Sequence, residues 1–123
     1  MIMGRKTFET IGRSLKDRLI VVMTRGKGGE AVEGVEYTNK APKEILQDLE
    51  SRGFEQAAIC GGAEIYSLFL REGLVDELFL TIEPVLFGSG IPLAAGFDRI
   101  NMEFIDSTKL NEQAILLHYR TRR

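Results

Sequence analysis

The chain has 123 residues, of which 44% are hydrophobic and 28% are charged, and its formal net charge is -2. This length fits a single domain over residues 1–123, and the ordinary composition excludes disordered and fibrous proteins. A lone cysteine, Cys60, excludes an intramolecular disulfide, disfavours a metal site and fits a reducing cytoplasm. The small net charge argues against a nucleic-acid partner, and no apolar stretch reaches the roughly 18 residues that a membrane span needs.

Apolar runs of strand length alternate with helical patterns along the chain. We expect strands at residues 1–3, 19–23, 35–38, 56–60 and 77–82, and helices at residues 7–11, 42–52 and 63–71. The glycines and prolines of residues 84–96 predict a loop. Two final strands, at residues 102–105 and 114–119, are close enough in sequence to form an antiparallel hairpin. This order predicts an α/β fold whose sheet is mostly parallel, with an antiparallel edge.

Two of the expected strand-to-helix junctions are suited to a ligand, because ligands of open parallel sheets lie beyond the carboxyl ends of the strands. At the first junction, Gly4 lets backbone approach a ligand, Arg5 and Lys6 add positive charge, and Thr7 adds a hydroxyl. This combination suits a phosphate group. A helix cap followed by two solvated basic residues would explain the same pattern equally well.

The second junction and the end of a neighbouring strand offer further phosphate ligands. Gly61 and Gly62 separate a buried strand from a helix, so a phosphate or a ring could lie against bare backbone, although a tight turn would also explain them. After residues 19–23, Thr24 and Arg25 could clamp a phosphate monoester, which favours the 2′-phosphorylated dinucleotide over the plain one. Without the two junctions, Arg25 would be interpreted as a solvated loop residue.

Residues 3–15, MGRKTFETIGRSL, with Arg18 following, resemble the first signature of the dihydrofolate reductase family. Residues 60–66, CGGAEIY, are similar to the second signature of that family, and the spacing between the two also fits. The resemblance covers essentially the whole chain. It implies an NADPH-dependent reductase of folate and one-carbon metabolism on a three-layer α/β/α fold.

The resemblance implies a cofactor site and a substrate site. The implied cofactor residues are Gly4, Arg5, Lys6, Thr7, Thr24, Arg25, Gly61, Gly62, Ala63, Glu64 and Ile65. The implied substrate residues are Phe8, Ile11, Leu15, Arg18, Cys60, Tyr66 and Thr81. Arg18 matches the arginine that pairs with the glutamate-tail carboxylate of folate, and Tyr66 matches a tyrosine near the nicotinamide. The resemblance also implies a cis peptide bond between Gly61 and Gly62.

The C-terminal part favours a different substrate. Residues 83–93, EPVLFGSGIPL, resemble the reductase domain of bacterial riboflavin biosynthesis. That domain shares the fold and the cofactor, and it reduces a ribosylaminopyrimidine phosphate. Two reductase hypotheses therefore stand side by side, one for dihydrofolate or a related pterin and one for the riboflavin precursor.

The family resemblance also implies a further strand, a mobile loop and a helix ahead of the first signature, including the acid that assists protonation of the pterin. No residue of this chain matches that acid. Glu9, Glu64, Asp76 and Glu83 are weak substitutes, and the lone His118 is better explained as a surface residue of a strand. We therefore expect weak or no dihydrofolate reduction by the 123-residue chain, and a third hypothesis is NADPH binding without turnover.

Without that further strand, the expected strands at residues 56–60 and 77–82 would each lack one neighbour. Unpaired edges invite pairing with another chain. Three explanations are open: the chain is part of a longer product, the two edges close on each other, or two chains complete one another. For the chain as it stands, we expect a homodimer.

Overall fold

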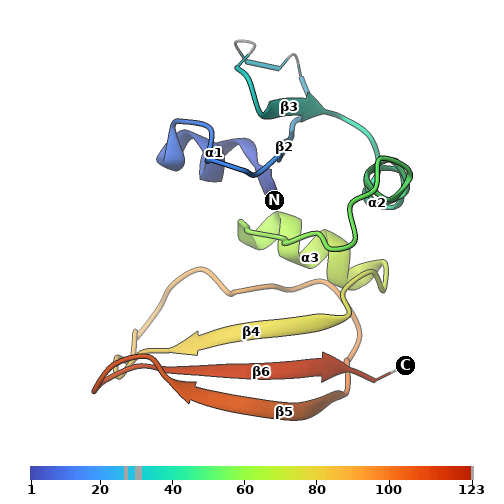
Figure 1. The fold of residues 1–123 in the computed structure, drawn as a ribbon. Coiled ribbons are helices and arrows are strands. Elements are labelled where there is room, and N and C mark those ends of the chain that lie inside the picture. Colours follow the sequence, from blue (N-terminus) through green and yellow to red (C-terminus); the bar gives the residue numbers. More distant parts are fainter. Residues whose placement is uncertain (27, 30–31, 123) are drawn as a thin grey trace.

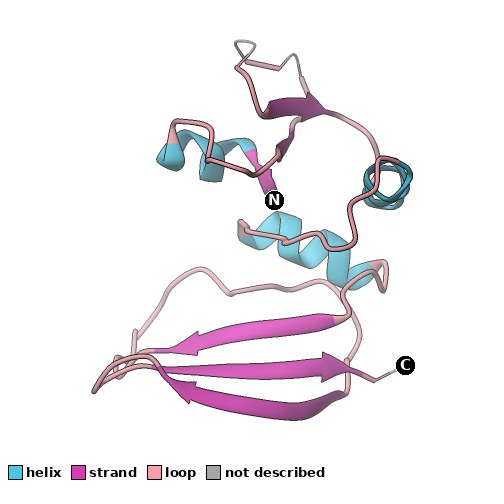
Figure 2. Cartoon of the chain, viewed as in Figure 1, coloured by secondary structure: helices cyan, strands magenta, loops and turns pink. Residues whose placement is uncertain are grey.

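The computed structural model describes residues 1–26, 28–29 and 32–122, arranged as shown in Figures 1 and 2. The helices are α1 (Arg5–Ile11), α2 (Pro42–Ser51) and α3 (Ala63–Arg71). The strands are β1 (Ile2–Gly4), β2 (Ile20–Met23), β3 (Val35–Thr38), β4 (Glu77–Ile82), β5 (Met102–Lys109) and β6 (Ile115–Thr121). They form one parallel and one antiparallel sheet, which confirms the predicted α/β class.

The first sheet has the order β1-β2-β3, and its strands are all parallel. The central strand, β2, is rich in β-branched residues, and Ile20, Val21 and Val22 are at most 5% exposed. A strand that is covered on both faces has this uninterrupted apolar pattern. Beside β1, Ile59 forms one further parallel bridge with Ile2.

Helices cover both faces of the parallel sheet. One apolar cluster joins the sheet to α2 and α3 and contains Ile2, Val21, Ile45, Leu49 and Phe69. A second cluster joins the opposite face to α1 and contains Met3, Phe8, Ile20, Val22 and Val35. Successive strand residues point to opposite faces, so the parallel sheet is the middle of three layers. In the described part of the chain, no helix combines the length and apolar character needed to cross a membrane.

The second sheet has the order β4-β6-β5, is antiparallel, and lies beside α3 in Figure 1. Its β5–β6 pair is the predicted terminal hairpin. Between β4 and β6, the Phe79 and His118 rings stack with 4.2 Å between their centroids. His118 Nε2 also lies 3.0 Å from a Glu77 carboxylate oxygen. The Phe79 side chain is nevertheless 60% exposed, so these contacts lie on the surface of the sheet.

Several predicted boundaries differ from the structure. Helix α1 begins at Arg5 rather than at residue 7, because extended Gly4 caps it and Arg5 pairs with Glu9 one turn later. Strands β5 and β6 are longer than predicted, because backbone pairing continues past the apolar residues that indicated them. Strand β4 belongs to the antiparallel sheet, since its partner is β6. Helix α2 and strand β2 each lack one predicted end residue.

Residues 56–60 form less of a strand than predicted, because they have a neighbour on one side only. Ile2 N–H donates to Ala58 O and Cys60 N–H donates to Ile2 O, both at 2.8 Å. The opposite side of this segment pairs with none of the described strands, and β4 pairs with β6 alone among them. Within the described residues, the two edges therefore do not close on each other.

We expect the chain to self-associate, because unpaired strand edges and exposed apolar side chains both favour contact with a second copy. The loop after β4 supplies much of this apolar surface, where Leu86 is 100% and Phe87 is 85% exposed. Sedimentation equilibrium at micromolar concentration should give a mass above the 13.8 kDa of one chain. Replacing both residues with glutamate should raise the dissociation constant roughly tenfold or more.

The matched control is Phe54→Glu, which changes a 43% exposed residue outside this loop and should leave the measured mass unchanged. A clean 13.8 kDa species for the unaltered chain would show that the free edges do not drive association.

Candidate functional site

The carboxyl ends of the parallel strands lie at one edge of the first sheet. Strand β1 ends at Gly4, β2 at Met23 and β3 at Thr38. The parallel bridge at Ile59 brings the end of residues 56–60 to the same edge. Helices α1 and α3 both begin there, directly after Gly4 and Gly62. Ligands of open α/β sheets lie at this edge, so it is the candidate site.

Backbone contact joins the two glycine junctions. Gly4 N–H donates to Gly61 O at 2.8 Å. A Cβ atom on Gly4 would lie only 3.2 Å from Ile65 Cγ1, so α3 packs directly against the bare backbone of β1. A Cβ atom on Gly62 would lie 3.8 Å from the Thr7 hydroxyl oxygen. The structure therefore brings the residues of both junctions together.

The turn at Gly61 and Gly62 presents backbone rather than side chains. Their peptide bond is cis, as the family resemblance implies. Gly61 is buried with φ +110°, a conformation that residues with a Cβ rarely adopt, whereas Gly62 is exposed. Gly62 caps α3 without a side-chain hydrogen bond, so the first N–H groups of α3, from Ala63 onward, suit an anionic group. The Glu64 side chain in the same turn is exposed and complements the positive end of the helix.

The basic side chains of the first junction differ in their partners. Arg5 Nε lies 3.3 Å from a Glu9 carboxylate oxygen, and this i,i+4 pair is exposed on α1. Lys6 is exposed and forms no ion pair within the described part of the chain. A ligand at this junction would therefore compete with Glu9 for Arg5, whereas none of the described residues competes for Lys6.

The turn after β2 holds the next basic residue. Thr24 N–H donates to Thr38 O at 2.9 Å, which continues the pairing of β2 with β3 by one residue. The Thr24 hydroxyl then accepts a hydrogen bond from Gly26 N–H at 3.3 Å. Arg25, between them, is exposed and has no ion-pair partner among the described residues. At the carboxyl edge of the sheet, its guanidinium is therefore free of ion pairs with the described residues.

Four predicted substrate residues share one apolar cluster. Phe8, Ile11, Leu15 and Cys60 all pack on the α1 side of the parallel sheet. Phe8 is 9% exposed, and its ring meets Tyr37 edge-on with 6.1 Å between centroids. Phe8 therefore acts as a core residue, whereas the half-buried Ile11 and Leu15 border the solvent.

Electrostatic effects link the remaining residues near this cluster. Burial raises the pKa of the Cys60 thiol, while the charges of the amino terminus and of Arg18 lower it. Burial also raises the pKa of Tyr66, and the negative charge of a Cys60 thiolate would raise it further. At neutral pH both side chains are therefore uncharged, and the positive charge of Arg18 acts on Cys60. Tyr66 also lies beside the glycine turn, since a Cβ atom on Gly61 would be 3.5 Å from its hydroxyl oxygen.

One predicted substrate residue lies elsewhere, and one neighbour of the site was not predicted. Thr81 is exposed on β4, opposite Leu116 of β6, and so belongs to the second sheet. Tyr37 contacts Phe8, and a Cβ atom on Gly28 would lie 2.6 Å from Tyr37 Cβ. The only sequence signal for Tyr37 is an aromatic residue in a short strand, which does not identify its partners.

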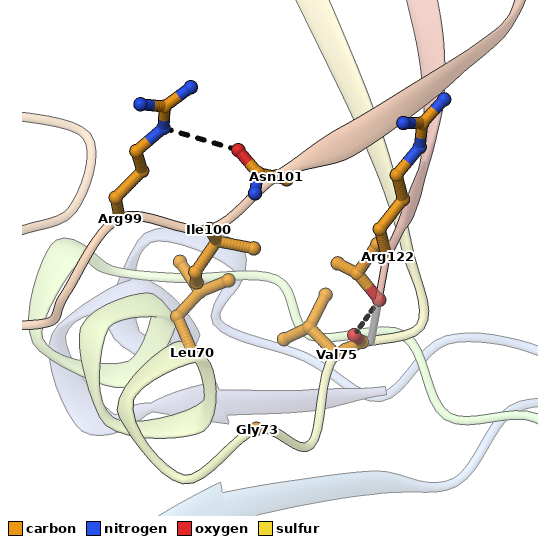
Figure 3. Close-up of a pocket in the computed structure, with 8 residues that line it drawn as sticks. Leu70, Gly73, Val75, Arg99, Ile100, Asn101 and Arg122 are labelled. Atoms are coloured by element: carbon orange, nitrogen blue, oxygen red, sulfur yellow. Dashed lines mark hydrogen bonds between the residues drawn. The ribbon is translucent and has the colours of Figure 1, made fainter.

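The cavity drawn in Figure 3 lies at the opposite end of α3 from Gly62. It has a volume of about 240 Å³ and is lined by Leu70, Gly73, Val75, Arg99, Ile100, Asn101, Thr121 and Arg122. None of the predicted cofactor or substrate residues lines it. This cavity is therefore separate from the site at the sheet edge.

Comparisons with known proteins agree with this architecture. The family model for dihydrofolate reductase matches residues 1–88. The chain is 30% identical over 124 residues to the Bacillus subtilis uncharacterised protein YwjB, an alignment that covers 97% of this chain and 71% of YwjB. It is also 30% identical over 116 residues to a Haemophilus influenzae dihydrofolate reductase, covering 92% of this chain and 67% of that enzyme.

Solved structures show the same fold at lower sequence identity. A putative riboflavin biosynthesis protein from Shewanella sp. PV-4 aligns with a TM-score of 0.85 and 24% identity, over 99% of this chain and 73% of that one. Acinetobacter baumannii RibD aligns with a TM-score of 0.76 and 22% identity, over 98% of this chain and 46% of that one. The solved structures show the fold, and the family-model match over residues 1–88 together with the two 30% identical relatives shows that the chain belongs to the dihydrofolate reductase family.

We expect Gly61→Ala to lower the free energy of unfolding by about 1–3 kcal/mol, because a Cβ atom is strained at φ +110°. Gly62→Ala is the matched control, since φ is -79° there and the nearest atom to a new Cβ would be 3.8 Å away. The control should change the free energy of unfolding by less than about 0.5 kcal/mol. Urea unfolding followed by circular dichroism measures both values, and equal losses would contradict this account of the turn.

Proposed function

We propose that the chain binds NADPH at the carboxyl edge of the parallel sheet and acts as a reductase, transferring hydride to a C=N bond of dihydrofolate or a related pterin. The observation that carries the proposal is the joined pair of glycine junctions. Gly4 is hydrogen bonded to Gly61, and Gly62 offers bare backbone beside the Thr7 hydroxyl. Membership of the dihydrofolate reductase family supports the same reading.

The residues at this edge fit the phosphates of a dinucleotide. Exposed backbone at Gly62 and the uncapped first turn of α3 offer N–H donors to an anionic oxygen. Thr7 adds a hydroxyl, and the Arg25 guanidinium, which pairs with no carboxylate of the described residues, matches a phosphate monoester in a bidentate way. When the cofactor is bound, its nicotinamide supplies the hydride chemistry. The role of these residues is to bind and orient.

The apolar cluster beside this edge fits the ring and tail of the substrate. Ile11 and Leu15 are half-buried and offer an apolar border on which a flat ring could lie. Arg18 is exposed close to Cys60, where its charge could hold a carboxylate tail. Fixing both ends of the substrate would orient its C=N bond and lower the entropic part of the barrier.

The proton that accompanies hydride transfer has no assigned donor. Glu9 is already paired with Arg5, and Glu64 is exposed in the first turn of α3. A positioned acid contributes about 10²–10⁴-fold to a rate. We therefore propose that any dihydrofolate reduction by this chain alone is slow. NADPH binding does not need the proton donor, so we expect it even where turnover is weak.

We expect the chain to prefer NADPH over NADH, because Arg5 at the start of α1 and Arg25 in the turn after β2 lie at the same sheet edge. Each charge-assisted hydrogen bond contributes roughly 1.5–3 kcal/mol, so losing two should cost at least about tenfold in NADPH affinity. The double change Arg5→Ala with Arg25→Ala should abolish the preference, as measured by fluorescence titration with both dinucleotides. Arg71→Ala, which changes an exposed arginine in the last turn of α3, is the control. Equal binding of NADPH and NADH by the unaltered chain would refute the 2′-phosphate assignment.

The alternative substrate is a ribosylaminopyrimidine phosphate, which the resemblance of residues 83–93 favours. Arg18 distinguishes the two, because a folate tail carries carboxylates. If dihydrofolate is the substrate, Arg18→Ala should raise its KM roughly tenfold or more while leaving kcat nearly unchanged. Arg13→Ala, a nearby exposed arginine, is the control. An unchanged KM would favour the phosphorylated pyrimidine, and NADPH binding with no oxidation by either substrate would select binding without turnover.

A further inference from the structure

The cavity in Figure 3 combines an apolar base with a rim of hydrogen-bond donors. Leu70 of α3 and Ile100 lie together beneath the rim in the view shown. Arg99 and Arg122 stand on either side of Asn101, and both guanidinium groups extend toward the same side. Such a pairing of apolar and donor groups is typical of sites for small organic ligands.

Asn101 is hydrogen bonded to the side chain of Arg99 and to the backbone of Arg122. Arg99 Nε donates to Asn101 Oδ1 at 3.1 Å, which leaves the two terminal amino groups of Arg99 free. Arg122 N–H donates to Asn101 O at 2.8 Å, so the backbone that carries the second guanidinium is attached to the same residue. A side-chain hydrogen bond therefore holds Arg99 at the rim, whereas Arg122 is tied to Asn101 through its backbone alone.

Positive charge at this rim has no counter-ion among the described residues that line the cavity. Neither Arg99 nor Arg122 forms an ion pair with a described residue, and no carboxylate of the described residues lines the cavity. The acceptor on Asn101 is already used by Arg99, and the Thr121 hydroxyl donates to Val75 O at 2.8 Å. The cavity thus offers mainly donors to a ligand, and an anion is the ligand that satisfies them.

We propose that this cavity binds a small organic carboxylate, with the carboxylate at the two guanidinium groups and an apolar body against Leu70, Val75 and Ile100. A planar guanidinium matches a carboxylate in a bidentate way. The volume of about 240 Å³ holds on the order of eight groups the size of a water molecule, which suits one substituted ring. An inorganic phosphate would leave the apolar base against water, so the base favours an organic anion. This site is separate from the sheet edge and does not rest on the proposed function.

Benzoate is the probe for this proposal, and benzamide, with the same shape and no charge, is its matched control. The full chain is titrated with each while NMR follows the methyl groups of Leu70, Val75 and Ile100. We expect saturable shifts with benzoate and at least roughly tenfold weaker binding of benzamide, because a charged pair is lost. Equal affinities for the two probes would overturn the proposal, as would inorganic phosphate binding as tightly as benzoate.

Two variants test whether Arg99 and Arg122 supply the positive charge that binds benzoate. Arg99→Gln and Arg122→Gln keep much of the side chain and should each weaken benzoate binding roughly tenfold. Arg71→Gln removes an exposed arginine in the last turn of α3 that does not line the cavity, and it should leave the affinity unchanged. Circular dichroism confirms that each variant is folded. An equal loss in Arg71→Gln would mean that overall charge, and not this cavity, attracts the probe.

Discussion

The hydrogen bond from Gly4 N–H to Gly61 O is the contact on which the candidate site depends. It extends the parallel pairing of Ile2 with Ile59 to the end of both segments, and so places the starts of α1 and α3 at one edge. The close approach favours glycine, because a Cβ atom on Gly4 would lie 3.2 Å from Ile65 Cγ1, closer than ordinary contact. A larger residue there would press on the Ile65 side chain and so disturb the packing of α3 against β1. The chemistry of the edge is therefore set by backbone packing first and by side chains second.

The two halves of the structure are stabilised in different ways, and α3 connects them. In the parallel half, apolar side chains are buried on both faces of the sheet, and Phe69 anchors α3 there with no exposed surface. In the antiparallel half, Phe79 and Phe104 are both more than half exposed. The Ser67 hydroxyl of α3 accepts a hydrogen bond from Ala95 N–H at 2.9 Å, which attaches the loop after β4 to the helix. Because the second sheet has little buried core of its own, its position depends on such contacts with α3 and on whatever covers its free edge.

The pattern of apolar residues predicted the helices and strands that have a buried face. It did not predict strand segments that are exposed and are held only by backbone hydrogen bonds to a neighbouring strand. Strand β2 and helix α3 were found because burial on two faces or one face leaves a distinct period in the sequence. The second half of β5, at residues 106–109, is polar and exposed, so only its register with β6 reveals it as a strand. In the site, the two glycine junctions follow from local sequence, whereas the contact of Phe8 with Tyr37 depends on the order β1-β2-β3. The pairing of Arg5 with Glu9 is a side-chain contact of another kind, because it depends only on the i,i+4 spacing, which is visible in the sequence.

The two ends of α3 bind anions, in our proposals, by different physical means. At the N-terminus, Gly62 exposes backbone donors, and the helix dipole itself favours negative charge. At the C-terminus the same dipole opposes an anion, so attraction there has to come from the side chain of Arg99, which Asn101 holds, and from that of Arg122. Loss of an arginine near the N-terminus of α3 therefore leaves the backbone donors in place. Loss of Arg99 or Arg122 leaves the C-terminal site with only half of its positive charge. Since bulk salt screens exposed guanidinium groups more than hydrogen bonds to backbone, the C-terminal end is also the one whose affinity depends more steeply on ionic strength.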